Sequence, residues 1–222
     1  MKPLKITAYM QTGKIATTDL YLPLDSILAE AWMRKYHPER MAGSQSSIKP
    51  EDFIIPELPL ERRGEGDDWY WACSFACGEP RQEEIVHWHK RFDQALGEQY
   101  VDFEGRRGKV DTHSGAYKGY RMPLVTYLIS KLEWYAMGDA DGVGELLRDV
   151  THIGKKRSQG YGRVARWDVE DYPEDLSHLR ALPDPDGGEM GIRPPYWLAW
   201  QWRRARIPDD PRLACNAVLG VN

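Results

Sequence analysis

Hydrophobic and polar residues alternate over residues 4–11, and this period of two predicts a strand with one buried face. Its apolar side consists of Leu4, Ile6, Ala8 and Met10. From residue 24 the apolar positions repeat at helical spacing instead, with Pro23 suited to a first turn and Pro38 at the end. The chain therefore begins with a strand followed by a helix.

Three more extended segments and a second helix are predicted further along. Residues 39–67 are rich in Pro, Gly, Ser and charge and predict a long connection, after which residues 68–78 predict a strand. Residues 124–137 are rich in β-branched and aromatic residues, which predicts one long strand. A helix from about residue 139 to 153 and a last strand over residues 162–170 complete the pattern.

This order of elements is that of a split β-α-β arrangement. It predicts an α+β fold of the ferredoxin-like (RRM-like) βαββαβ type, with a four-stranded antiparallel sheet and the helices on one face. Residues 80–122 mix basic, aromatic and glycine positions, and we interpret them as a hairpin-like insertion. We expect one domain over residues 1–170 that contains this insertion, and a C-terminal extension over residues 171–222 that packs on it.

Composition limits the classes of function. The 222 residues are 41% hydrophobic and 29% charged, which is ordinary for a globular protein, and the net charge is −4. That charge argues against a free-standing nucleic-acid binder but allows a local basic strip. The N-terminus lacks the apolar stretch of a signal peptide and no apolar run is long enough to span a bilayer, so we expect a cytoplasmic protein.

The run "IGKKRSQGYGR", residues 153–163, contains cations, glycines and a tyrosine without any acid. It follows a predicted helix and enters a strand, which is the reverse of a phosphate-binding Walker loop. Its glycines permit positive φ and its side chains offer charge and one stacking face, so it predicts a nucleic-acid contact. The alternative is a glycine helix cap with cations that complement the dipole, which would explain only Gly154 and one or two lysines. The candidate contacts are Lys155, Lys156, Arg157, Ser158, Gln159, Tyr161 and Arg163.

The insertion offers a second set of candidate RNA contacts. The segment "HWHKRFD" places His87 and His89 on one side of an extended chain and Trp88 and Lys90 on the other. An RNA-binding surface and a solvated hairpin with one apolar side both fit this pattern. The candidates are His89, Arg91, Arg106, Arg107, Lys118 and Arg121.

Two other clusters have a structural and a functional interpretation. Cys73 and Cys77 could join two histidines around zinc, but a flat strand spaces the two cysteines about 13 Å apart, so no metal or other cofactor is expected. Trp197, Trp200 and Trp202 could stack on nucleic acid or anchor a partner, and we expect at least one of them to be buried.

The glycine-rich run "GKKRSQGYG" resembles the loop that follows the second helix in the RAMP superfamily of CRISPR-associated proteins. The N-terminal "LKITAYMQTGKIATTDLYLPLDSILAEAWM" resembles more specifically the Cas-five-type subunit of type IV CRISPR effectors. This similarity covers most of residues 1–38 and 124–170 and, more loosely, "RPPYW". It implies a noncatalytic subunit that grips the 5′ handle of the guide RNA (crRNA) and caps a filament of backbone RAMP subunits. It also implies contact with the large subunit and help in positioning target DNA, with the glycine-rich loop on the RNA and the insertion acting as a thumb.

Two rival functions stay open. Some RAMP relatives cleave their own guide RNA without metal, and His37 lies after the first helix, where such enzymes often place a histidine; Lys155 or Tyr36 could assist. A helix-terminal histidine favoured by the dipole explains His37 equally simply. The other rival is a protein-only adaptor that does not touch RNA.

Overall fold

The computed structural model describes residues 1–41, 49–100 and 110–217. Its central sheet consists of three antiparallel strands in the order β7-β1-β8, which are β1 (Lys2–Met10), β7 (Lys131–Gly138) and β8 (Val164–Asp171). The alternation predicted for β1 is confirmed, because Leu4, Ile6 and Ala8 are completely buried. The fold is α+β with antiparallel pairing, which is compatible with the expected ferredoxin-like arrangement, but the central sheet has three strands where four were expected.

The predicted strand over residues 68–78 is much shorter than expected. Only β4 (Tyr70–Trp71) forms a ladder, with β3 (Arg62–Arg63), and the following residues meet β7 through isolated bridges from Cys73 and Cys77. The backbone N–H groups of Phe75 and Ala76 donate to other segments instead, to the carbonyls of Leu179 and Leu22. This stretch is buried on both sides, so its backbone is shared among several neighbours and cannot form one continuous ladder.

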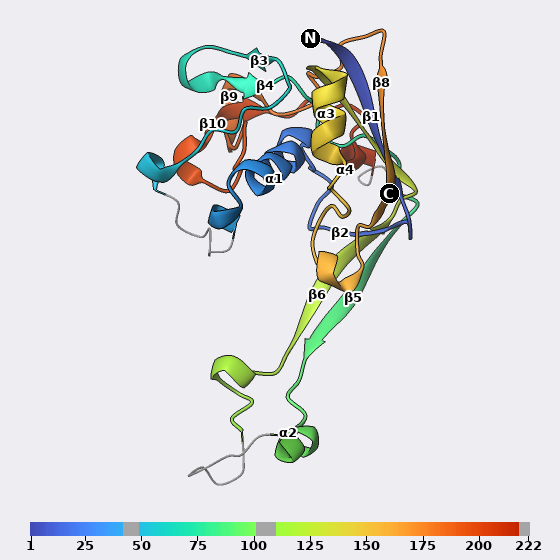
Figure 1. Cartoon of the computed structure of the whole chain (residues 1–222), viewed down its shortest axis with the longest axis vertical. Helices are drawn as coiled ribbons and strands as arrows, with labels where there is room; N and C mark the ends of the chain where they lie inside the picture. The colour runs from blue at the N-terminus through green and yellow to red at the C-terminus, as the bar shows by residue number, and fades with distance from the viewer. Residues whose placement is uncertain (42–48, 101–109, 218–222) are drawn as a thin grey trace.

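Two helices lie on the same side of the central sheet and contact each other (Figure 1). They are α1 (Leu24–Tyr36) and α3 (Ala140–Leu147). The Asp139 carboxylate caps α3 by accepting the Gly142 N–H at 2.8 Å. The helix ends at Leu147, six residues before the predicted end, because the chain then turns to pair with the start of β8.

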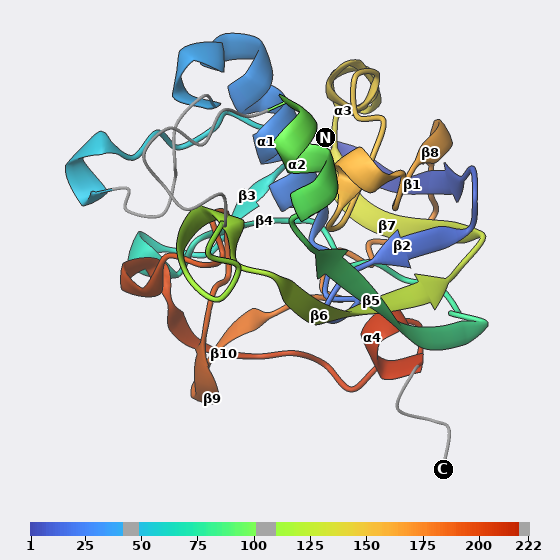
Figure 2. The same ribbon diagram turned by 90° about the horizontal axis from the view of Figure 1, so that it is seen from below.

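A long β-hairpin extends away from this body (Figure 1), and Figure 2 looks at the molecule from the end to which the hairpin points. It consists of β5 (Gln82–Lys90) and β6 (Tyr120–Leu128), with α2 (Gln94–Tyr100) at its far end, and β6 also pairs with β2 (Lys14–Ala16) at its base. The prediction of one strand over residues 124–137 is therefore wrong. Backbone hydrogen bonds from Ile129 N–H to Gly13 and from Met10 N–H to Ser130 hold a turn that separates β6 from β7.

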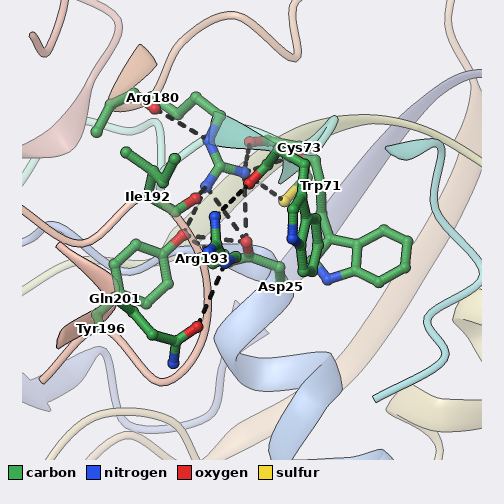
Figure 3. A network of polar contacts seen from close by, with 10 residues as sticks. Asp25, Trp71, Cys73, Arg180, Ile192, Arg193, Tyr196 and Gln201 are labelled. Atoms are coloured by element: carbon green, nitrogen blue, oxygen red, sulfur yellow. Dashed lines mark hydrogen bonds and ion pairs between the residues drawn. The ribbon is translucent and has the colours of Figure 1, made fainter. Parts of the chain in front are cut away.

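The C-terminal residues form a second small sheet from β9 (Leu182–Met190) and β10 (Arg203–Arg206), followed by α4 (Ala214–Ala217). A buried polar network attaches this part to α1 (Figure 3). Arg180 and Asp25 are both completely buried and form an ion pair at 3.3 Å, and the Tyr196 hydroxyl donates to Asp25 at 2.9 Å. Arg180 also donates to the carbonyls of Trp71, Cys73 and Ile192.

The electrostatics of this network follow from its burial. Desolvation opposes the charge of Arg180, yet Tyr196 and Asp25 raise the pKa of Arg180 above its ordinary value, so the guanidinium remains charged. Burial raises the pKa of Asp25, and Arg180 and Tyr196 counteract that shift. None of the helices in the described part of the chain is long and apolar enough to cross a membrane.

Candidate nucleic-acid interface

The glycine-rich loop is folded back onto β2 at the base of the hairpin. Lys155 N–H donates to the Ala16 carbonyl at 2.7 Å, and Gly162 N–H donates to the Lys14 carbonyl at 2.8 Å. Gly154 and Gly162 have positive φ, and a Cβ on Gly162 would lie 1.8 Å from the Ile153 carbonyl oxygen, so this turn requires glycine. The glycine-cap alternative is wrong, because α3 ends at Leu147 and Gly154 serves the turn against β2.

The cations of the loop point to different neighbours. The Lys156 ammonium lies 3.4 Å from the centre of the Trp88 ring on β5, which is a cation–π contact. Lys155 hydrogen-bonds the Thr18 hydroxyl, and Arg157 forms an ion pair with Glu30 of α1 at 2.8 Å. The loop therefore joins α1, β2 and the projecting hairpin. The remaining candidates on the loop are Ser158, Gln159 and Arg163, which are exposed, and Tyr161, which is half-buried.

The sequence pattern did not predict the ion pair with Glu30. The run contains no acid of its own, but α1 brings a carboxylate to it, and Glu30 Oε1 also accepts from Arg34 at 2.6 Å. Part of the expected local positive charge is neutralised in this way. Lys155 and Lys156 have no such carboxylate in the described residues.

The hairpin divides its candidates between two faces. Its register pairs Trp88 with Met122 and Lys90 with Tyr120 on the face that meets Lys156, and the Trp88 and Tyr120 rings lie 5.0 Å apart. His89 pairs with Arg121 on the opposite face, so these two candidates do not share a surface with the loop. The predicted alternation is confirmed for residues 87–90, whereas Arg91 and Phe92, which were expected to continue it, lie beyond the end of β5. Arg91 and Lys118 are exposed beyond the ends of the two strands, and Arg106 and Arg107 lie outside the described residues.

Trp88 and Tyr120 belong to this candidate interface but were not among the RNA contacts predicted from the sequence. Aromatic and cationic residues alternate at i, i+2 spacing on this face of the hairpin, and that pattern was the available signal. Only the register of β5 and β6 and the position of the loop show which face matters.

Two clefts meet at the ion pair between Arg157 and Glu30. One has a volume of about 500 Å³ and lies between α1, α3 and the loop. The other has a volume of about 980 Å³ and lies between α1 and residues 194–197. Both are lined by Ser26, Glu30, Arg34 and Arg157.

The remaining candidates lie elsewhere. His37 follows the last turn of α1, where its backbone N–H donates to Met33, and its ring lies 5.2 Å from that of Trp32 and does not line either cleft. Burial raises the pKa of the Cys77 thiol to about 12, which keeps it protonated and a poor metal ligand. Within residues 1–41, 49–100 and 110–217, no group of three or more His, Cys, Asp or Glu side chains is placed to hold a metal ion.

The expectation that at least one of the clustered tryptophans is buried is wrong. Trp197, Trp200 and Trp202 are 48%, 42% and 41% exposed, and they lie in or next to a short 3-10 helix (Ala199–Gln201). Phe53 contacts the Trp200 ring, whereas Trp197 makes no ring contact with any described residue.

Over residues 2–208 the sequence matches a protein family described as CRISPR type IV associated protein Csf3. The chain belongs to this family. This result confirms the association with type IV CRISPR that the N-terminal resemblance implied. A search of the curated proteins finds no match.

Proposed function

We propose that this chain is a noncatalytic guide-RNA-binding subunit of a type IV CRISPR effector complex. Membership of the Csf3 family supports the CRISPR association, and the resemblance of the glycine-rich loop to that of RAMP proteins supports an RNA contact. In this role the chain grips and caps the 5′ handle of the guide RNA and helps to position target DNA. Its protein partners are the backbone RAMP subunits and the large subunit of the effector.

The observation that carries this proposal is the contact between Lys156 and Trp88. It brings together the glycine-rich loop and the hairpin, which are the two regions with candidate RNA contacts. Lys155 and Lys156 provide charge for phosphates, and Trp88 and Tyr120 provide aromatic rings for bases. A single strand could therefore contact both regions at once.

RNA binding as a function of salt tests the proposal. Three cations that neutralise phosphates of one strand give a slope of about −2 in log affinity against log salt concentration. The double variant Lys155→Gln, Lys156→Gln should weaken binding of repeat-derived RNA and reduce the magnitude of this slope. The matched control is Lys2→Gln, Lys49→Gln, which removes two exposed lysines outside both the loop and the hairpin. Equal binding by the two double variants would contradict the proposal and favour the protein-only adaptor.

The same preparation tests the absence of catalysis. Purified protein is incubated with repeat RNA in the presence of a metal chelator, and the RNA is examined for cleavage. We expect intact RNA with the wild type and with His37→Ala. Cleavage by the wild type that is lost in His37→Ala would establish the endoribonuclease alternative instead.

A further inference from the structure

Arg34 and Arg157 come from distant parts of the chain and converge on one carboxylate oxygen. Glu30 Oε1 accepts from Arg34 Nη2 at 2.6 Å and from Arg157 Nη1 at 2.8 Å. Two guanidinium groups repel each other, so this arrangement requires an anion between them. Each uses one of its five N–H donors on Glu30, which leaves most of its donors available.

A phosphate group suits the position that Glu30 occupies. Guanidinium groups bind phosphate through paired N–H donors, and a phosphate offers more acceptor oxygens than the single carboxylate oxygen used here. All three side chains are partly exposed, so a phosphate can reach the arginines without unfolding the surrounding structure. Glu30 therefore holds the two arginines together in the absence of a ligand and competes with one.

The larger cleft next to these arginines has the character of a base-binding groove. Its volume of about 980 Å³ lies within the range of about 300–1,000 Å³ typical of ligand sites. Apolar side chains line much of it, including Met33, Phe53 and Trp197, and the Trp197 ring has no stacking partner among the described residues. The smaller cleft is less suitable for a base, since no Phe, Tyr or Trp side chain is among its lining residues.

The wall that carries Trp197 is fixed to α1. Its neighbour Tyr196 donates to Asp25 and accepts from Arg180 at 2.7 Å, and Arg180 also donates to the Ile192 carbonyl (Figure 3). The groove thus has one side on α1 and the other on a segment held by buried hydrogen bonds. Such a groove is preorganised for a ligand.

We propose that Arg34 and Arg157 bind one phosphate of the RNA in place of Glu30, and that the base of the adjoining unpaired nucleotide enters the groove beside Trp197. This inference rests on the RNA-binding function proposed above, because Arg157 belongs to the glycine-rich loop. The two arginines provide the phosphate contact, and the lining of the groove also contains Arg40 and the acids Glu39 and Asp52. Displacement of Glu30 leaves Arg34 and Arg157 available to the phosphate. Arg40 already donates to the Asp52 backbone carbonyl, and the Glu39 carboxylate lies 3.5 Å from the His37 ring.

Three variants test the parts of the site separately, with a single-stranded oligouridylate as the probe. Glu30→Gln removes the competing charge and should tighten binding about two- to fivefold. Arg34→Gln should weaken binding and reduce the magnitude of the salt slope by about 0.7. Trp197→Ala should weaken binding of oligouridylate by about 5- to 150-fold but leave an oligomer of abasic sugar phosphates unaffected. The matched control is Arg148→Gln, an exposed arginine that lines neither cleft.

The outcomes distinguish this inference from the proposed function. If Lys155→Gln, Lys156→Gln weakens binding whereas Arg34→Gln and Trp197→Ala behave like Arg148→Gln, the chain binds RNA but this nucleotide site is wrong. Weaker binding by Glu30→Gln would mean that Glu30 only positions the arginines, which also overturns the inference. If no variant changes the affinity, both proposals fail. Thermal unfolding of each variant confirms that the fold is retained.

Discussion

Removal of the buried Asp25 carboxylate should destabilise the protein strongly. Asp25→Ala leaves the Arg180 guanidinium fully buried with only neutral partners, which are the hydroxyl of Tyr196, the Cys73 sulfur and four backbone carbonyls. At a separation of 3.3 Å the two charges attract each other by about 5 kcal/mol with an effective dielectric constant of about 20. Breaking one side of a buried pair typically costs about 3–5 kcal/mol, and we expect a loss in that range for the free energy of unfolding.

The assay is urea denaturation followed by circular dichroism, with thermal unfolding as a second measurement. For a chain of this size, each kcal/mol lowers the midpoint of thermal unfolding by about 2–4 °C. The matched control is Asp171→Ala, which removes the carboxylate of the exposed ion pair with Lys2. Exposed pairs contribute at most about 1 kcal/mol, so this control should remain close to the wild type.

A similar small effect of both substitutions would refute the argument that burial makes the Asp25 pair important. If Asp25→Ala does not fold, Tyr196→Phe offers a milder perturbation. It removes the hydroxyl that donates to Asp25 and accepts from Arg180, and we expect it to cost about 1.5–3 kcal/mol. A Tyr196→Phe variant as stable as the wild type would show that this hydroxyl does not hold residues 192–197 against α1.

Two further predictions concern the loop and the acid stability. Gly162→Ala should cost more free energy of unfolding in urea than Gly160→Ala. At Gly160 φ is +86° but the space is open, so only backbone strain of about 1–2 kcal/mol applies, whereas at Gly162 φ is +69° and the new Cβ would also meet the Ile153 carbonyl. Equal losses would refute the steric reason. The hydrogen bond with Arg212 lowers the pKa of Asp210 to about 2, below its value of about 3.9 in the unfolded chain. This stabilisation is therefore present above about pH 4 and is lost as the pH falls towards 2, so Asp210→Asn should flatten the acid side of the stability curve. An unchanged slope would contradict the pairing.

The regular parts of the fold could be predicted because local periodicity reports which side of an element is buried. The alternation along β1 and the helical repeat of α1 required only neighbouring positions, and the structure confirms both. The prediction failed where packing overrides local preference. Residues 124–137 are rich in β-branched and aromatic strand formers, yet hydrogen bonds to Gly13 and Met10 introduce the turn at Ile129 and Ser130.

The candidate site shows the same division. Residue types identified the glycine-rich loop as the candidate for RNA binding, and its glycines are needed where φ is positive. The sequence by itself did not indicate that Lys156 would lie on Trp88, or that Arg157 would meet Glu30, which is 127 residues away. The pair of Arg180 and Asp25, 155 residues apart, was equally invisible.

The sequence by itself determined the family, the main strand and helix of the core and the loop that offers charge. The tertiary structure decided which face of the hairpin meets that loop, which arginine is neutralised and where a groove opens beside it. The physical reason is that side-chain spacing along a strand or helix is set by the backbone. Contacts between distant segments depend on how whole elements pack, and no local pattern records that packing.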